Sequence, residues 1–157
     1  MNDPISDLEG PTANAGRDCE RVLRTLPQWF GIERSLLAYA ASTEHLPTFV
    51  ARDDGGRVIG FISVAEQAPQ GWELHCMAVD AAFRRRGVGR RLHRHAERWL
   101  AAAGARSLEV KTLAPSHPDC EYGETRQFYE GIGYVPGEEA ADGGHLPVLQ
   151  LVKPIEG

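Results

Sequence analysis

A strand, a glycine-containing turn and a long helix follow one another between Trp72 and Ala103, and this succession constrains the fold more than any other stretch. The segment Trp72–Asp80 is typical of a strand. From Gly87 to Ala103, apolar residues recur at spacings of three and four, which is the pattern of a helix with one buried face. These apolar residues are Val88, Leu92, Ala96, Trp99 and Leu100. The chain therefore contains at least one strand–turn–helix unit.

The turn of this unit combines two glycines with five arginines, within Phe83–Leu92. The first N–H groups of a helix have no partner inside the helix and carry partial positive charge. Gly87 and Gly89 would allow a ligand to approach those groups closely. Arginine guanidinium groups add fixed charge and match the oxygens of a phosphate. We therefore predict that a pyrophosphate binds at this turn.

Composition alone also allows a nucleic-acid-binding or nuclear-localisation role for the arginine run Arg84–Arg91. The formal net charge of -5 argues against general nucleic-acid binding, because the positive charge is concentrated locally against an acidic background. The two glycines inside the run also favour a phosphate-binding turn over a simple basic patch. Salt-sensitive binding to DNA or RNA remains the competing hypothesis.

The remaining pattern predicts an α+β protein with one strand–helix–strand crossover. The chain of 157 residues is long enough for one domain, 1–157, in which we expect residues 1–16 to be loosely ordered apart from a short strand at Ile5–Leu8. The expected helices are Asp18–Leu26, Ile32–Ala41, Gly87–Ala103 and Thr125–Gly131, and the expected strands are Thr48–Arg52, Val58–Glu66, Trp72–Asp80, Ser107–Leu113, one beginning at Tyr134, and Val148–Val152.

The sequence has three cysteines, Cys19, Cys76 and Cys120, and this small and odd number argues against a disulfide framework. The sequence also has no apolar run of transmembrane length and no N-terminal signal pattern. We therefore expect a cytoplasmic protein. The pairs His117 and Cys120, and His93 and His95, do not reach the three or four convergent ligands of a zinc site, so we expect no metal.

Two motifs together resemble the GNAT N-acetyltransferases. Arg84-x-x-Gly87-x-Gly89, after a strand that ends Met77-Ala78-Val79-Asp80, is similar to the acyl-CoA-binding motif of that family. Phe128-Tyr129-Glu130-Gly131-Ile132-Gly133-Tyr134 resembles its second signature, a tyrosine-bearing helix followed by a Gly-aromatic turn. The two motifs stand in the family's order, and the resemblance covers Thr48–Val152, roughly two-thirds of the chain.

The resemblance implies a mixed, twisted sheet that is splayed between its fourth and fifth strands, with acetyl-CoA as co-substrate. The pantetheine would pair with main-chain groups of Met77, Ala78 and Val79, as an added strand does. The backbone around Arg84, Arg85, Arg86, Gly87, Val88, Gly89 and Arg90 would hold the pyrophosphate. The family often has an Asn about seven residues before the helix tyrosine, and this sequence has Tyr122 there.

Two side chains are candidates for the chemistry of acyl transfer. Glu73 lies at an even offset from Val79, so both residues share one face of the strand, and a glutamate at this offset is the general base in some family members. Tyr129 is the candidate general acid, since the resemblance implies that its hydroxyl lies near the CoA sulfur. His75 shares the face of Glu73 and is the alternative base. Cys76 points to the opposite face and is expected in the core.

The acceptor implied by the resemblance is an amine of a small molecule or peptide. Trp29, Phe30 and Tyr39 would line an aromatic wall or cap the core. The loop Glu138–His145 carries carboxylates that would attract a cationic amine or keep the loop soluble. A non-catalytic acyl-CoA-binding sensor or interaction module on the same fold is the competing hypothesis. A homodimer is one assembly open to this chain, and no nucleic-acid or membrane partner is expected.

Overall fold

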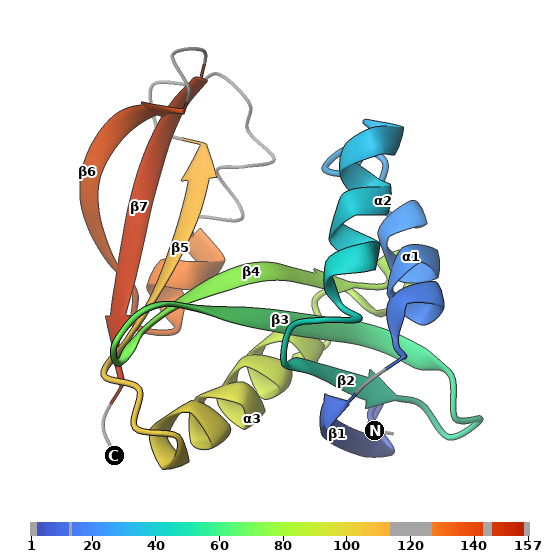
Figure 1. Cartoon of the computed structure of the whole chain (residues 1–157). Helices are drawn as coiled ribbons and strands as arrows, with labels where there is room; N and C mark the ends of the chain where they lie inside the picture. The colour runs from blue at the N-terminus through green and yellow to red at the C-terminus, as the bar shows by residue number, and fades with distance from the viewer. Residues whose placement is uncertain (1–2, 13, 114–126, 143–145, 156–157) are drawn as a thin grey trace. The chain divides into compact units, whose positions relative to one another are not determined.

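The computed structural model describes residues 3–12, 14–113, 127–142 and 146–155 (Figure 1). The strands are β1 (Asp7–Thr12), β2 (Thr48–Arg52), β3 (Val58–Ala68), β4 (Gly71–Val79), β5 (Ser107–Leu113), β6 (Val135–Asp142) and β7 (Leu146–Pro154). The helices are α1 (Gly16–Arg24), α2 (Glu33–Ser42) and α3 (Val88–Ala102), with a 3₁₀ turn, η1 (Ala81–Phe83), and a helical turn at 127–131. The strand order is β1-β2-β3-β4-β5-β7-β6.

The chain divides into two compact units. The first comprises Met1–Ala65 and Leu74–Leu100, and the second comprises Glu66–Glu73 and Ala101–Gly157. The strands of the sheet are antiparallel in the pairs β1–β2, β2–β3, β5–β7 and β6–β7, whereas β4 and β5 run parallel. The sheet is therefore mixed, as a strand–helix–strand crossover requires.

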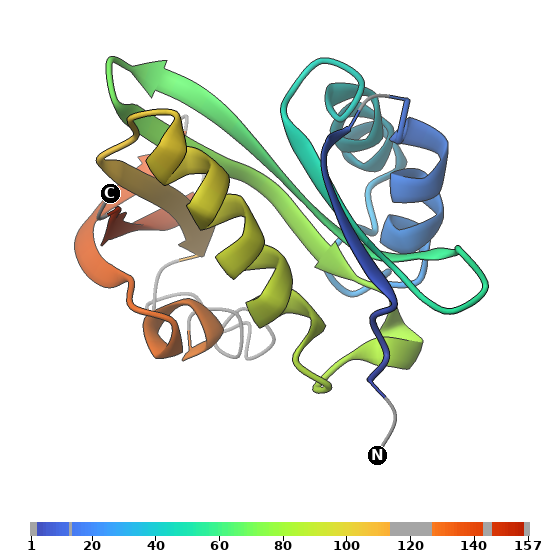
Figure 2. The same ribbon diagram turned by 90° about the horizontal axis from the view of Figure 1, so that it is seen from below.

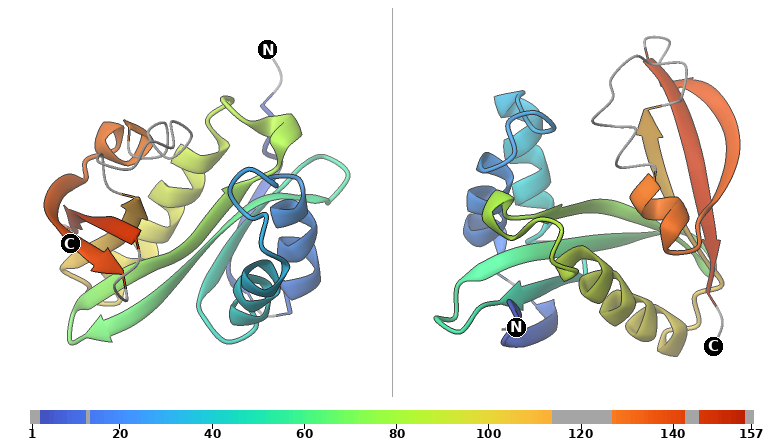
Figure 3. Two further views of the ribbon diagram at one scale, coloured as in Figure 1. Left: turned by 90° about the horizontal axis from the view of Figure 1, so that it is seen from above. Right: turned by 180° about the vertical axis from the view of Figure 1, so that it is seen from behind.

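In the first unit, helices cover both faces of the strands. Helices α1 and α2 lie on one face, and α3 lies on the other (Figures 1 and 3). Figure 2 shows α3 running along its face of the strands, with β1 at the outer edge of this unit. Strand β1 begins two residues later than the expected Ile5–Leu8 strand and continues to Thr12, where it pairs with Thr48 of β2.

Successive side chains of β2 point into two separate layers of the core, one on each face of the strand. Phe49 and Val50 are both fully buried, although successive side chains of a strand point to opposite faces. Val50 belongs to an apolar cluster that includes residues of α1 and α2, among them Val22 and Leu23 of α1. Phe49 stands against the ring of Trp99 in α3, with 5.6 Å between centroids. The unit is thus a helix–sheet–helix sandwich, in which burial on both faces explains the continuous apolar runs in β2 and β3.

Gly60 sets the distance between β3 and α3. A Cβ at this position would lie 3.0 Å from Leu92 Cδ1 and 3.2 Å from both Val88 Cγ1 and the carbonyl oxygen of Ala78. We expect Gly60→Val to lower the free energy of unfolding by about 1–3 kcal/mol, because the added atoms must push α3 away from the strands. Urea denaturation measures this loss. Gly55→Ala, where the new Cβ makes only an ordinary contact, should change stability by less than about 0.5 kcal/mol.

In the second unit, β7 is the central strand between β5 and β6. Residues Ser107–Leu113 pair in one continuous antiparallel register with Val148–Pro154. Strand β4 contributes its first three residues, because Gly71, Trp72 and Glu73 pair in parallel with Ser107, Leu108 and Glu109. Leu108 and Leu151 are fully buried in this unit.

The prediction of a loop at Glu138–His145 is wrong in part. Residues 138–142 belong to β6 and pair with β7, after a register shift between Pro136 and Glu139. Pro, Gly and Glu are unfavourable in strands, so the local sequence gives no strand signal here. The pairing with the apolar strand β7 outweighs that local preference, and the irregularity accommodates the mismatch. Residues 143–145 lie outside the described part of the chain.

Candidate active site

Strand β4 presents two different faces. Leu74, Cys76 and Ala78 are buried, whereas Glu73, His75, Met77 and Val79 are half-buried. Cys76 and Ala78 of the buried set belong to the apolar cluster that includes residues of α1 and α2. The half-buried set contains the candidate base Glu73, the alternative base His75 and two of the expected cofactor-binding positions, Met77 and Val79. Strand periodicity is therefore as predicted along β4.

The end of β4 turns sharply at Asp80. Its backbone N–H donates to the carbonyl oxygen of Ile59 at 2.8 Å, which closes the pairing with β3. Its carboxylate accepts from the N–H of Ala82 at 2.9 Å and so caps η1. This 3₁₀ turn was not predicted from the sequence, although Asp at an N-cap position was an available signal. The cap fixes where the chain leaves the strand and enters the arginine run.

The arginine turn has an unusual backbone, which suits an anion. Arg85 and Gly87 both adopt left-handed conformations, with φ of 62° and 81°. Helix α3 begins directly afterwards, and its first intrahelical bond runs from Arg91 N to Gly87 O at 3.1 Å. Left-handed residues beside a helix start can direct successive N–H groups to one side and form an anion-binding concavity. A Cβ at Gly87 would meet no described atom within 4 Å, so the space beside this residue is open.

The arginines of the turn differ in their partners. The guanidinium of Arg84 lies over the ring of Trp29, with Cζ 4.4 Å from the ring centroid, and that of Arg86 lies 5.5 Å from the ring centroid of Phe83. Arg91 forms an exposed ion pair with Asp3 at 2.6 Å. Both contacts place a guanidinium on the face of an aromatic ring, and such stacking does not neutralise the charge of the guanidinium. Positive charge at the start of α3 adds to that of the helix end.

A row of aromatic rings leads from the segment after α1 to β4. Phe30 and Tyr39 meet edge to face at 5.8 Å between centroids, and Tyr39 meets the His75 ring at 5.5 Å. Trp29, Phe30 and Tyr39 are partly buried and pack against the apolar core of the first unit. All three predicted aromatic residues therefore pack against the core, and Tyr39 also reaches His75 on the half-buried face of β4.

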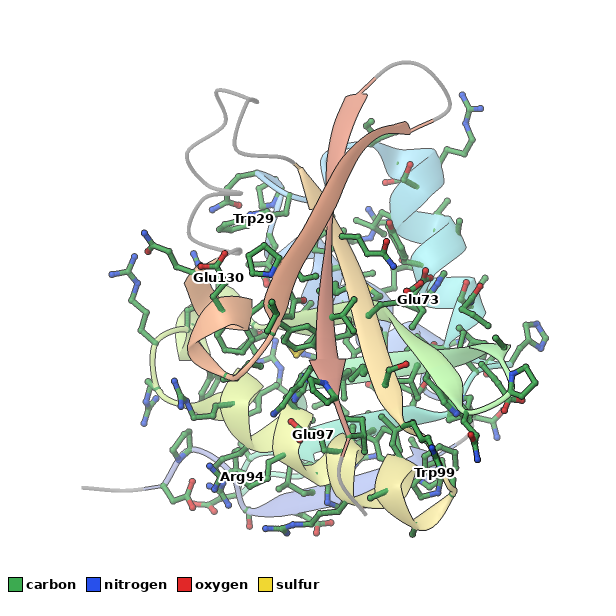
Figure 4. All side chains as sticks on the ribbon, turned by 90° about the vertical axis from the view of Figure 1, so that its left-hand side faces the viewer. Trp29, Glu73, Arg94, Glu97, Trp99 and Glu130 are labelled. Carbon is green, nitrogen blue, oxygen red and sulfur yellow. The ribbon has the colours of Figure 1, made fainter. Side chains whose placement is uncertain are left out.

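Glu73 has a second carboxylate beside it in the sheet. The parallel register pairs Glu73 with Glu109 of β5, and residues paired in this way point to the same face. Both side chains are half-buried, and the carboxylate of Glu109 accepts a hydrogen bond from the amide of Gln150. Figure 4 labels Glu73 on its strand. Glu109 was not a candidate from the sequence, because no local pattern reveals which residues of two distant strands become neighbours.

Tyr129 is buried in the second unit, with 5% of its surface exposed. It lies on the helical turn at 127–131, and its ring meets Phe128 at 5.4 Å and Tyr134 at 5.3 Å between centroids. The N–H groups of Ile132 and Tyr134 both donate to the Tyr129 carbonyl oxygen at 3.1 Å. Gly133, with φ of 108°, makes the turn that brings Tyr134 back against Tyr129. The second motif thus forms one compact aromatic cluster.

The described cysteines are buried and free. Burial raises the pKa of the Cys19 thiol to about 12, and burial also raises the pKa of Cys76. Because the thiolate is the reactive form, we expect both thiols to stay unreactive toward an aromatic disulfide reagent from about pH 7 to pH 10. In a Cys120→Ser variant, the native protein should react slowly and the guanidinium-unfolded protein should release two equivalents, one each from Cys19 and Cys76. A fast-reacting thiol in the native variant would contradict this burial.

Three positions named from the sequence lie outside the described residues, namely His117, Cys120 and Tyr122. Within the described ranges, no group of three His, Cys, Asp or Glu side chains could hold a metal ion. None of the helices in that same part of the chain has the length and apolar character needed to cross a membrane.

Comparison with known proteins gives a consistent result. The model of the acetyltransferase (GNAT) family matches residues 16–134. An uncharacterised N-acetyltransferase of Chlorobaculum tepidum is 36% identical over 70 residues, which is 45% of this chain and 45% of that protein. The match therefore spans less than half the length of this curated relative.

Solved structures resemble the whole chain. An aminoglycoside 6'-N-acetyltransferase complexed with coenzyme A has a TM-score of 0.75 at 20% identity, over 96% of this chain and 98% of that one. The ribosomal-protein-S18-alanine N-acetyltransferase from Escherichia coli has a TM-score of 0.74 at 16% identity, over 96% and 94%. At these identities the likeness concerns the fold. The predicted α+β fold of the GNAT type is confirmed.

Proposed function

The chain belongs to the acetyltransferase (GNAT) family, and from that premise we propose that it acetylates an amine of a small molecule or peptide by direct transfer from acetyl-CoA. Acetyl-CoA is the co-substrate. The observation that carries the proposal is the turn between β4 and α3, where left-handed Arg85 and Gly87 precede the helix start. This turn provides amide groups, open space and positive charge for the diphosphate of CoA.

The cofactor would be bound by two neighbouring parts of the first unit. Main-chain groups of Met77, Ala78 and Val79 would pair with the pantetheine, since amides and carbonyls at the edge of a strand accept an extended ligand as they accept a further strand. The amides from Arg84 to Arg90 would bind the diphosphate, with arginine side chains balancing its charge. Support comes from the half-buried odd-numbered face of β4 and from the backbone of the turn.

Glu73 would be the general base. An ammonium group has no lone pair, so the acceptor must lose a proton before its nitrogen attacks the thioester carbon. Glu73 would take that proton and leave a neutral amine, whose nitrogen then forms the new C–N bond. Its half-buried position at the start of β4, on the face that it shares with His75, Met77 and Val79, supports this role. His75, on the same face and against Tyr39, is the rival base.

Tyr129 would be the general acid. As the C–S bond breaks, the departing thiolate of CoA gains negative charge, and a phenolic proton would neutralise it. The support is the position of Tyr129 in the second family motif and the fixed orientation of its ring between Phe128 and Tyr134. The nitrogen loses its second proton as the amide forms, and this proton would restore the Tyr129 hydroxyl. The products are then the N-acetylated amine, free CoA with its thiol proton, and one proton that Glu73 would release to solvent.

We also infer a cytoplasmic location, because Cys19 and Cys76 are free thiols in the structure, as a reducing compartment favours. Cell fractionation with an antibody against the chain tests this inference. Appearance of the protein in a membrane or extracellular fraction would contradict it.

The direct test is an acetylation assay with the purified chain. Acetyl-CoA and a panel of amines are incubated with the protein, free thiol is followed over time, and products are identified by mass. The panel contains polyamines, amino sugars, amino acids and peptides with free N-termini. We expect thiol release that depends on one amine class. If calorimetry detects CoA binding but no amine releases thiol, the chain is a non-catalytic acyl-CoA-binding module, and if CoA does not bind, the proposal fails altogether.

A further inference from the structure

The segment that follows α1 contacts the chain between β4 and α3 at two points, one in η1 and one in the arginine turn. The hydroxyl of Thr25 accepts a hydrogen bond from the N–H of Ala81 at 3.1 Å and donates to the carbonyl oxygen of Val22 at 2.7 Å. Four residues further along, the Trp29 ring lies against the guanidinium of Arg84 at 4.4 Å. All of these residues belong to the first unit. The C-terminal end of α1 is thus fastened to the start of the turn.

Trp29 is itself held in a defined place. Its backbone N–H donates to the carbonyl oxygen of Leu26 at 3.1 Å, and its side chain packs against the apolar core of the first unit. Its indole Nε1 is buried, and among the described residues it has no hydrogen-bond partner. The ring therefore acts through its apolar surface and its π face, and the face contacts Arg84.

A guanidinium on an aromatic face keeps its charge and directs its N–H edge away from the ring. Ordering a long arginine side chain when a ligand binds costs conformational entropy. Contact with a fixed ring reduces that cost before the ligand arrives. Arg84 is also the first residue of the Arg84-x-x-Gly87-x-Gly89 motif, so a change in its orientation acts directly on the candidate phosphate site.

We propose that Trp29 is a positioning residue that holds Arg84 in the orientation in which it binds the diphosphate of CoA. This inference rests on the proposed function, since it needs CoA to bind at the arginine turn. The segment after α1, which lies outside both sequence motifs, would thereby contribute to cofactor affinity. Thr25 assists by fixing the backbone just before Arg84 through Ala81.

A double-mutant cycle with CoA binding as the readout tests the inference. Dissociation constants for CoA are measured by calorimetry for the unchanged chain, Trp29→Ala, Arg84→Gln and the double variant. We expect Trp29→Ala to raise the dissociation constant about three- to tenfold when Arg84 is present. In the Arg84→Gln background the same change should have less than about a twofold effect, because the interaction that it removes is already absent.

Controls separate positioning from general loss of structure. Trp29→Phe keeps a ring under Arg84 and should bind CoA within about threefold of the unchanged chain. Trp99 is another half-buried tryptophan of the first unit, at the far end of α3 from the turn (Figure 4), and Trp99→Ala should reduce thermal stability without changing CoA affinity. If Trp29→Ala unfolds at the assay temperature, Trp29→Leu keeps an apolar volume, lacks the π face and replaces it in the cycle.

Two results would overturn the inference while leaving the proposed function intact. One is an equal loss of CoA affinity on replacing Trp29 in both backgrounds, which would mean that Trp29 acts independently of Arg84. The other is a loss in Trp29→Phe as large as in Trp29→Ala, which would assign the effect to the indole N–H. Failure of the unchanged chain to bind CoA is a separate result that rejects the proposed function itself.

Discussion

Replacing Glu73 with Gln should lower kcat for amine acetylation by about a hundred- to ten-thousandfold, the range expected for loss of a general base. The amide of Gln has nearly the same shape as the carboxylate but cannot accept the proton of an ammonium group. The acceptor would then enter the reaction only in its rare neutral form. The measurement is initial-rate thiol release at saturating acetyl-CoA, with the best amine from the panel.

Glu109→Gln is the matched control, because Glu109 is the paired residue of Glu73 on the neighbouring strand and carries the same group. Its carboxylate is hydrogen-bonded to Gln150, and we expect kcat in this variant within about threefold of the unchanged chain. His75→Asn tests the rival base on the same face of β4. A large loss in His75→Asn together with near-normal turnover in Glu73→Gln would transfer the role of base from Glu73 to His75.

Local periodicity accounts for most of the predicted fold. The strands Thr48–Arg52 and Ser107–Leu113 have the bounds expected from the sequence, and α3 differs from its expected bounds by one residue at each end. These segments carry strong apolar patterns with clear turn or glycine boundaries. Strand β6 has no such pattern. Its residues form a strand because they pair with β7. A pairing partner far along the chain leaves no trace in the local sequence.

The candidate site, like the fold, was predictable from the sequence only in part. Sequence motifs predicted the arginine turn, Tyr129 and the shared face of Glu73 and His75, because those features depend on spacing within one element. They did not find the contact of Trp29 with Arg84 or the pairing of Glu73 with Glu109, because each joins segments that are separated by dozens of residues.

The side chain of His93 illustrates a further limit. It is 1% exposed on α3, and its Nδ1 lies 2.6 Å from the Glu97 carboxylate. Helical spacing of four residues makes such a contact available, but it does not reveal that an imidazole is buried. Burial of a polar residue depends on the elements packed around it, and those become known only with the tertiary structure.

Tyr129→Phe should lower kcat by about ten- to a thousandfold, because the thiolate of CoA would leave without a proton donor. The change removes one oxygen atom and keeps the ring that packs between Phe128 and Tyr134. Stability should therefore fall by no more than about 1–2 kcal/mol, the usual cost of losing one hydroxyl interaction. The affinity for CoA, measured by calorimetry, should change less than kcat does, since the hydroxyl would act on the leaving group as the C–S bond breaks.

Tyr134→Phe is the matched control, since it removes the same atom from the neighbouring ring of the same buried cluster, where 3% of Tyr134 is exposed. If both variants lose turnover in proportion to their loss of stability, the cluster is structural and Tyr129 has no part in the chemistry. A loss specific to Tyr129→Phe, at unchanged CoA affinity, separates proton donation from packing. Unchanged turnover in Tyr129→Phe would require another proton donor, with solvent water as the simplest, because every acyl transfer from a thioester must dispose of the negative charge on sulfur.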